Sequence, residues 1–293
     1  MKRTIAFLVA AVSLAGAGVC AGGDWALRIS GGLGWISPDD LNTFLRDYVR
    51  SHADESGSPV RGPGFKTIGR SAEFEVALFI PVETRLHLLA SFGALRASTT
   101  GNAFSTDYPA VAADYARDDR IRTYFGRLGA MYRWPVSGRL SVNPYAAAEA
   151  YWTTFEDSGS WSYRSHSSGE KILWMDWTES APSFNAGFSL GVELEVGVFS
   201  PVRLSVDAGY RRARLTGFKG NVRSTWSYPG GSSSENREDV FLYYCEHAGS
   251  DPALNYGTLN LPDIWGGRRL SLFREAIVDL SGPYLKAGFK IVF

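Results

Sequence analysis

Residues 184–198 alternate strictly between two kinds of side chain. Every second position is apolar, and the positions between carry glycine or polar and acidic residues. Because successive side chains of a β-strand point to opposite faces, this period of two predicts a strand with one apolar and one polar face. A strand between lipid and a polar barrel interior has this pattern, and so has a half-buried strand of a soluble sandwich. The segment alone leaves both open.

The same period recurs along the chain and predicts eight strands. We expect them at residues 25–35, 72–80, 86–97, 124–134, 140–152, 184–198, 202–211 and 278–293. An even number of strands, with both ends of the chain on one side, is typical of membrane barrels built from hairpins.

The connections between these strands differ in length at the two ends. Three similar segments, 81–86, 135–140 and 200–204, contain proline and predict tight turns. The other connections, residues 36–67, 98–118, 156–179 and 216–273, are long, and such loops are uncommon in compact soluble domains. The sequence therefore favours an all-β fold: an eight-stranded antiparallel up-and-down transmembrane β-barrel with short periplasmic turns and long extracellular loops.

The first long connection contains a predicted helix of about 13 residues. Ser37 suits the cap and Pro38 the first helical position, and acidic residues follow them. We expect this short helix to fold over the barrel mouth or to enter it. Binding to the membrane surface is the alternative. Its apolar face consists of Leu41, Phe44, Leu45, Tyr48 and Val49.

The N-terminal segment has the layout of a cleavable secretory signal. Lys2 and Arg3 precede an apolar stretch at residues 5–19, and Ala21 follows as a small residue at the expected cut. A retained membrane helix would need about 20 apolar residues, and Val19 does not suit lipidation of Cys20. We expect a signal peptide at 1–21 and a barrel domain at 22–293.

Composition excludes several classes of protein. The chain has 30 basic and 30 acidic residues and no long basic run, so we expect no nucleic-acid partner. Beyond the signal, no apolar stretch reaches the length of a membrane helix. Without the signal, Cys245 is the only cysteine, so we expect no intrachain disulfide.

The last strand ends in an aromatic residue, with apolar residues at alternate positions before it. In this feature the chain resembles outer-membrane β-barrel proteins of the small, eight-stranded OmpA- and OmpW-like type. The resemblance implies a bacterial outer-membrane location among outer-membrane lipids. It also implies that the barrel-insertion machinery reads Phe289, Ile291 and Phe293.

The strand faces assign twelve charged residues, six acidic and six basic, to the lumen. A barrel of eight strands has room for little more than its own side chains, and isolated buried charges are costly. We therefore expect a salt-bridged lumen rather than an ion pathway. The twelve residues are Arg28, Glu73, Glu75, Arg127, Arg133, Glu149, Glu193, Glu195, Asp207, Arg211, Lys286 and Lys290.

Apolar luminal residues allow one further interpretation. OmpW-like barrels are associated with apolar solutes, and Leu89, Phe125 and Met131 would either line an apolar path or simply fill the interior. We favour filling.

Aromatic residues form two predicted groups. Those near strand ends suit the interfacial girdles of a membrane barrel. Those in the long connections would either bind an extracellular ligand or pack strands that extend beyond the membrane, and we favour packing. The first group is Trp25, Trp35, Tyr124, Tyr132, Trp134, Tyr145, Tyr151, Trp152, Tyr210 and Tyr284; the second is Trp161, Tyr163, Trp174, Trp177, Trp226, Tyr228, Tyr243, Tyr244 and Trp265.

No motif predicts catalysis or a cofactor. The four histidines, His52, His87, His166 and His247, belong to no nucleophile motif and have no metal-ligand spacing. We expect a non-enzymatic protein with a structural or surface-interaction role. A small porin-like pore for small or hydrophobic solutes and an adhesin acting through its loops are the alternatives.

Overall fold

The structure is a computed structural model that describes residues 24–247, 252–257, 264–265 and 268–293. The predicted signal peptide at 1–21 lies outside these residues. The described chain is all-β apart from one helix, α2 (Asp39–Ser56). No helix in this part of the chain is long and apolar enough to cross a membrane.

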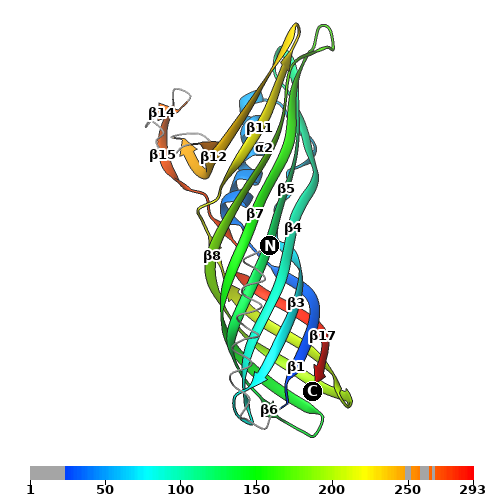
Figure 1. Cartoon of the computed structure of the whole chain (residues 1–293). Helices are drawn as coiled ribbons and strands as arrows, with labels where there is room; N and C mark the ends of the chain where they lie inside the picture. Colours follow the sequence, from blue (N-terminus) through cyan, green and yellow to red (C-terminus); the bar gives the residue numbers. More distant parts are fainter. Residues whose placement is uncertain (1–23, 248–251, 258–263, 266–267) are drawn as a thin grey trace.

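Eight antiparallel strands pair in a ring, because the last of them, β17, pairs with β1 as well as with β9 (Figure 1). Each ring strand overlaps one of the predicted strands. In order of pairing they are β1 (Ala26–Trp35), β3 (Arg70–Pro81), β4 (Leu86–Asp107), β5 (Val111–Tyr132), β7 (Leu140–Ser165), β8 (Lys171–Phe199), β9 (Val202–Arg212) and β17 (Gly282–Val292).

The complete sheet has 15 strands rather than eight. The additional strands lie outside the ring, and a separate pair, β10 and β16, forms a two-stranded sheet. The seven additional strands of the large sheet are β2 (Arg61–Gly64), β6 (Trp134–Pro135), β11 (Lys219–Tyr228), β12 (Gly231–His247), β13 (Pro252–Gly257), β14 (Ile264–Trp265) and β15 (Arg268–Glu275). The separate pair consists of β10 (Arg214–Leu215) and β16 (Val278–Asp279).

The prediction of long loops at residues 98–118 and 156–179 is wrong, because strands run through both segments. β4 and β5 are joined by residues 108–110 alone, and β7 and β8 by residues 166–170. The period of two continues there, with Tyr115 and Trp161 on the inner face, but the outer positions become polar. We call residues 98–120, 156–180 and 219–228 the extension; in Figure 1 it rises above the ring.

Helix α2 is longer than predicted, with 18 residues. It begins at Asp39 after Pro38, and Ser37 does not cap the backbone: its hydroxyl donates to the Asp39 carboxylate at 2.6 Å. It ends at Gly57, whose φ of 64° is a left-handed conformation that glycine adopts without strain. The additional turn places His52 against Tyr115, with ring centroids 4.5 Å apart.

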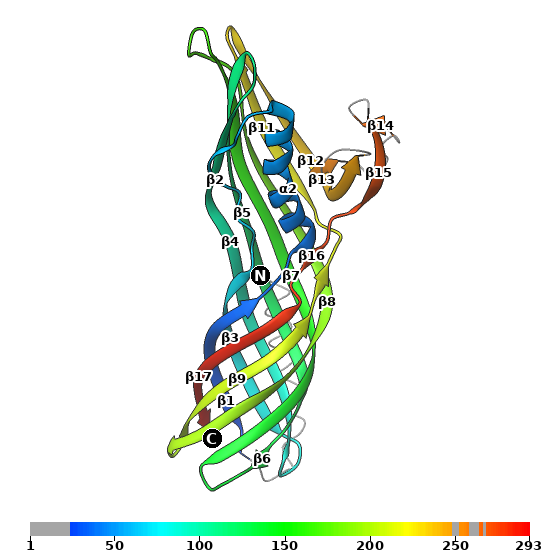
Figure 2. The ribbon, with the colours of Figure 1, turned by 180° about the vertical axis from the view of Figure 1, so that it is seen from behind.

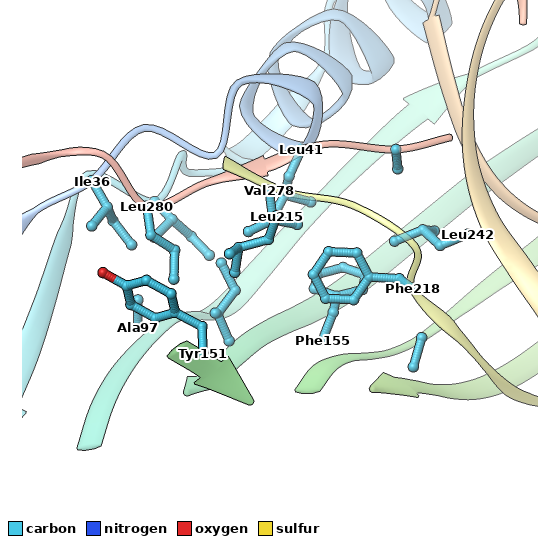
Figure 3. Close-up of a cluster of buried hydrophobic side chains, with 14 of the residues drawn as sticks. Ile36, Leu41, Ala97, Tyr151, Phe155, Leu215, Phe218, Leu242, Val278 and Leu280 are labelled. Carbon is cyan, nitrogen blue, oxygen red and sulfur yellow. The ribbon is translucent and has the colours of Figure 1, made fainter. Parts of the chain in front are cut away.

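The helix lies on the concave side of the extension, at the mouth of the ring (Figure 2). Its residues Leu41, Phe44 and Leu45 are buried in one apolar cluster with side chains from the ring and the connections, which we call the apolar plug. Figure 3 labels ten of its members: Ile36, Leu41, Ala97, Tyr151, Phe155, Leu215, Phe218, Leu242, Val278 and Leu280. The amphipathic face of α2 is thus buried within the protein, at the barrel mouth, as one of the two predicted placements requires.

We predict that Leu45→Ala releases the helix and leaves the ring intact. Leu45 is fully buried in the plug, and truncation of a buried leucine costs about 2–5 kcal/mol. Amide hydrogen exchange should become faster in α2 and remain slow in β1 and β17. Arg50→Ala, at an exposed position of the same helix, is the control. Equal exchange in α2 for both variants would contradict the prediction.

Candidate functional site in the barrel interior

The interior of the ring contains the charged residues that the alternation assigned to it. Eleven of the twelve are buried, and Arg133 is 31% exposed at the end of the ring that carries the short turns. Position parity explains this placement: in each ring strand, alternate side chains point inward. The structure brings these residues together into three groups along the axis.

The group nearest the short turns centres on Glu195. Its carboxylate lies 2.7 Å from Lys290 Nζ and 3.8 Å from Arg133 Nη2, and it also pairs with Arg203. Lys290 pairs in addition with Glu193, to which Asn143 Nδ2 donates at 3.3 Å. The sequence prediction omitted Arg203. The sequence could have predicted Arg203 as a luminal residue. It is separated from Asp207 and Arg211 by an even number of positions on the same strand, so its side chain points to the same side.

Glu75 and Asp207 are the anions of the central group. Arg127 Nη1 lies 3.1 Å and Arg28 Nη2 3.5 Å from the Glu75 carboxylate, and Lys286 forms a third ion pair with it. Asp207 Oδ2 forms ion pairs with Arg28 Nη2 at 3.2 Å and with Lys286 Nζ at 3.4 Å. Arg28 also pairs with Glu193, so the first two groups form one continuous network.

The third group lies next to the apolar plug. Arg127 Nε donates to Glu149 at 2.6 Å, which joins this group to the central one. Arg211 pairs with Glu73, whose carboxylate also accepts from Ser71 Oγ at 3.2 Å. Every one of the six predicted luminal carboxylates therefore has a cationic partner within the described lumen.

Three tyrosines that we predicted at the membrane interfaces lie in this network instead. Tyr145 donates to Asp207 at 2.6 Å and shares a hydrogen bond with Tyr284, and Tyr151 donates to Glu149. Their parity is that of the luminal charges, so the prediction based on strand ends was wrong for them. The other aromatic residues that were predicted for the interfacial girdles and that lie in the ring are exposed or half-buried on its outside.

Apolar layers lie on both sides of the charge network. Leu89 and Met131 belong to a cluster at the turn end, whereas Phe125 belongs to the apolar plug at the other. Arg127 stands between Phe125 and Met131 along β5. These three residues therefore form no continuous apolar path, and they fill two separate layers.

The final strand presents its alternate apolar residues to the outside. Phe289 is 62% exposed and Phe293 72% exposed, and Ile291 is on the same face. Their backbone is fixed by ring closure, because Phe289 pairs with Ile29 of β1 and with Leu204 of β9.

The extension contains a second, smaller charged cluster. Arg117 lies 3.0 Å from Asp119 and 2.9 Å from Asp157, and its guanidinium stacks on the ring of Phe44 in α2 at 4.6 Å. Burial and the neighbouring Asp157 charge raise the pKa of Asp119 to about 7, against the opposite influence of Arg117. Burial together with the charge of Asp157 also raises the pKa of Glu179 above its ordinary value.

Three aromatic residues of the predicted long connections, Trp161, Tyr163 and Trp226, pack against one another in the extension. Trp161 contacts Tyr163 and Trp226, with ring centroids 5.2 Å and 5.5 Å apart. Trp177 Nε1 donates to Asp157 at 3.2 Å. This agrees with the packing interpretation, although the outer ends of the strands leave several of these rings half exposed. The side chain of Trp265 lies outside the described part.

The described histidines are dispersed. His87 is buried at the turn end of the lumen, His52 contacts the Tyr108 hydroxyl at 2.9 Å beneath the extension, and His166 bonds to the Tyr108 carbonyl. The side chain of His247 falls outside the described residues. Within the residues described, no three His, Cys, Asp or Glu side chains are arranged to share a metal ion.

Comparisons with known proteins give only distant similarities. No protein-family model and no curated protein matches the chain. Among solved structures, a major outer membrane protein from Thermus thermophilus is similar at 12% identity, over 92% of this chain and 99% of that one, with a TM-score of 0.40. The outer membrane protease OmpT from Escherichia coli is similar at 11% identity, over 92% and 95%, with a TM-score of 0.23.

We predict that Glu75→Gln destabilises the ring by about 3–5 kcal/mol, because it leaves three buried cations without their shared anion. Urea unfolding of the purified protein in detergent micelles measures the change. Glu235→Gln removes a carboxylate that is 55% exposed, and should change the stability by less than about 1 kcal/mol. A Glu75 variant as stable as this control would show that the luminal pairs contribute little.

The pKa of Asp119 predicts that the extension loosens as pH rises. The folded pKa of about 7 exceeds the ordinary 3.8, so the folded state holds the proton more tightly and stability falls between about pH 4 and pH 7. Amide exchange in β4 and β5, corrected for the intrinsic rate, should show less protection at pH 8 than at pH 5. Asp119→Asn should reduce this difference and the exposed control Asp176→Asn should not. An unchanged pH dependence in Asp119→Asn would refute the assignment.

Proposed function

We propose that this protein is a non-enzymatic bacterial outer-membrane barrel with a closed interior and a structural or surface-interaction role. The observation that carries the proposal is the reversal of polarity across the wall: the ring has apolar side chains on its outside and paired charges inside. A water-soluble sandwich buries its apolar faces. A barrel with lipid around it exposes them.

The outer face has the dimensions of a membrane belt. Tyr124, Trp152 and Phe184 lie next to one another on three neighbouring strands near the extension, and Tyr132 and Trp134 lie near the short turns. The eight residue steps from Tyr124 to Tyr132 span about 26 Å along the strand, and somewhat less along the axis because strands tilt. An apolar band about 25 Å tall between aromatic girdles is expected of an outer-membrane barrel.

In this proposal the parts of the eight ring strands below the extension constitute the membrane-spanning barrel. The extension and the seven other strands of the large sheet lie outside it. Export through the predicted signal peptide and recognition of Phe289, Ile291 and Phe293 by the insertion machinery complete the route to the membrane. The outward exposure of these residues supports that recognition.

A closed interior is favoured over a pore. Eight strands leave an interior that side chains fill, and here ion pairs connect opposite walls, such as Arg28 of β1 with Glu193 of β8. The apolar plug then covers the network at the extension end. An ion crossing this barrel would have to displace both layers.

Two measurements test the proposal. Full-length protein expressed in a bacterium should sediment with outer membranes, and it should migrate on a denaturing gel at two positions according to whether the sample was heated. Purified protein in a planar lipid bilayer should give no reproducible conductance. A soluble periplasmic product would refute the barrel, and steady conductance steps with folded protein would support the pore instead.

A further inference from the structure

Four arginines gather on the outside of the wall, just beyond the aromatic belt. Arg96 of β4 and Arg122 of β5 are direct cross-strand partners, and each lies one outward position beyond the row that contains Tyr124. Arg120 lies two residues before Arg122 on β5, farther from the row that contains Tyr124, and Arg70 stands at the start of β3. We call these residues the arginine patch: Arg70, Arg96, Arg120 and Arg122.

The position of the patch on the sheet is fixed by the strand register. Ala72, two residues after Arg70, pairs with Arg96, so Arg70 and Arg96 are diagonal neighbours on adjacent strands. Ala94 pairs with Tyr124, and Tyr124 with Trp152, which places the belt immediately below the patch. The ring of Phe92 stacks on Tyr124 at 6.1 Å. The arginines therefore stand where a lipid's polar headgroup meets the protein.

The positive charge of the patch is only partly neutralised. Glu156 is the carboxylate that contacts it, at 3.2 Å from Arg122 and 3.5 Å from Arg120. Asp118, the next outward residue of β5, accepts a bond from the backbone of Gly101 at 2.8 Å. Among the residues that the structure describes, Arg70 and Arg96 have no ion pair, and both are exposed.

Two like charges directly opposite each other in a sheet are unfavourable unless an anion lies between them. The luminal arginines show the alternative arrangement, because each of them faces a carboxylate. Arg96 and Arg122 face each other. Glu156 pairs with Arg122 from β7, the strand on the other side of β5, whereas Arg96 has no such carboxylate. An external anion would relieve this repulsion and join the two guanidinium groups.

We infer that the arginine patch binds the phosphate groups of a phosphorylated glycolipid in the outer leaflet. A guanidinium group presents paired N–H donors that match phosphate oxygens, and every cation of the patch is an arginine rather than a lysine. The acyl chains of the same lipid would lie along the apolar face beneath Tyr124. This inference rests on the proposed function, since it requires the belt to be embedded in lipid.

The test measures binding of bisphosphorylated lipid A to the full-length protein in non-ionic detergent, by native mass spectrometry after a detergent wash. The native protein should retain the lipid. Arg96→Gln/Arg122→Gln should bind it more weakly by roughly tenfold or more, as expected for two arginines next to an anionic surface. Added salt should weaken the binding of the native protein.

A matched control variant removes the same number of positive charges at positions away from the belt. Arg164→Gln/Arg223→Gln removes two exposed arginines of the extension and should bind lipid A as the native protein does. Dephosphorylated lipid A should bind poorly to all three proteins. Inorganic phosphate at the same concentration should fail to displace the lipid.

Three results would overturn the inference: equal binding by the two double variants, equal binding of dephosphorylated lipid A, or displacement by inorganic phosphate, which would indicate a site for a free anion. The heat-dependent gel shift of each variant verifies that it has folded. If the native protein neither shows the shift nor sediments with outer membranes, the proposed function itself fails. If the native protein does show the shift and sediments with outer membranes, but the patch has no preference for lipid A, this inference alone fails.

Discussion

The rest of the structure depends on the mutual neutralisation of charges in a space that excludes water. A ring of eight strands is too narrow to hydrate the ionised groups pointing into it, and a buried ion without a partner is costly. Cations and anions therefore alternate through the interior. Glu75 illustrates the constraint, because three cations from three strands, Arg28, Arg127 and Lys286, share its two oxygens. The strand register must place each of these partners correctly, so ion pairing and backbone pairing specify the same ring.

The sequence predicted the wall of the ring well, because a single physical rule governs it. An apolar outer face and a charged inner face impose a period of two, which located all eight ring strands and the luminal charges. The same rule would have placed Arg203 and Tyr145 inside. Arg203 was missed because it was assigned to a turn, and Tyr145 because it was assigned to an aromatic girdle near a strand end. Beyond the row of Tyr124 and Trp152, outer positions such as Ser98 and Ser158 become polar. The apolar half of the pattern disappears there, so those strands resembled loops.

Other features depend on contacts that no local pattern contains. The apolar plug joins Leu41 of α2 with Leu280, far along the chain. The position of Arg96 opposite Arg122 requires the register of two strands. The length of α2 was underestimated because its last turn is stabilised by rings from β5, such as Tyr115, and not by its own composition.

The charge network has a consequence for the order of assembly. Lys286 and Lys290 both lie in β17, the last ring strand in chain order, and they pair with Glu75 of β3 and with Glu193 and Glu195 of β8. Until β17 joins the ring, each of these carboxylates lacks one of its cationic partners, and water has to take that place. In the proposed membrane setting, an unfinished sheet must therefore keep its inner face wet while its outer face contacts lipid. Closure of the wall and expulsion of that water then occur as one event.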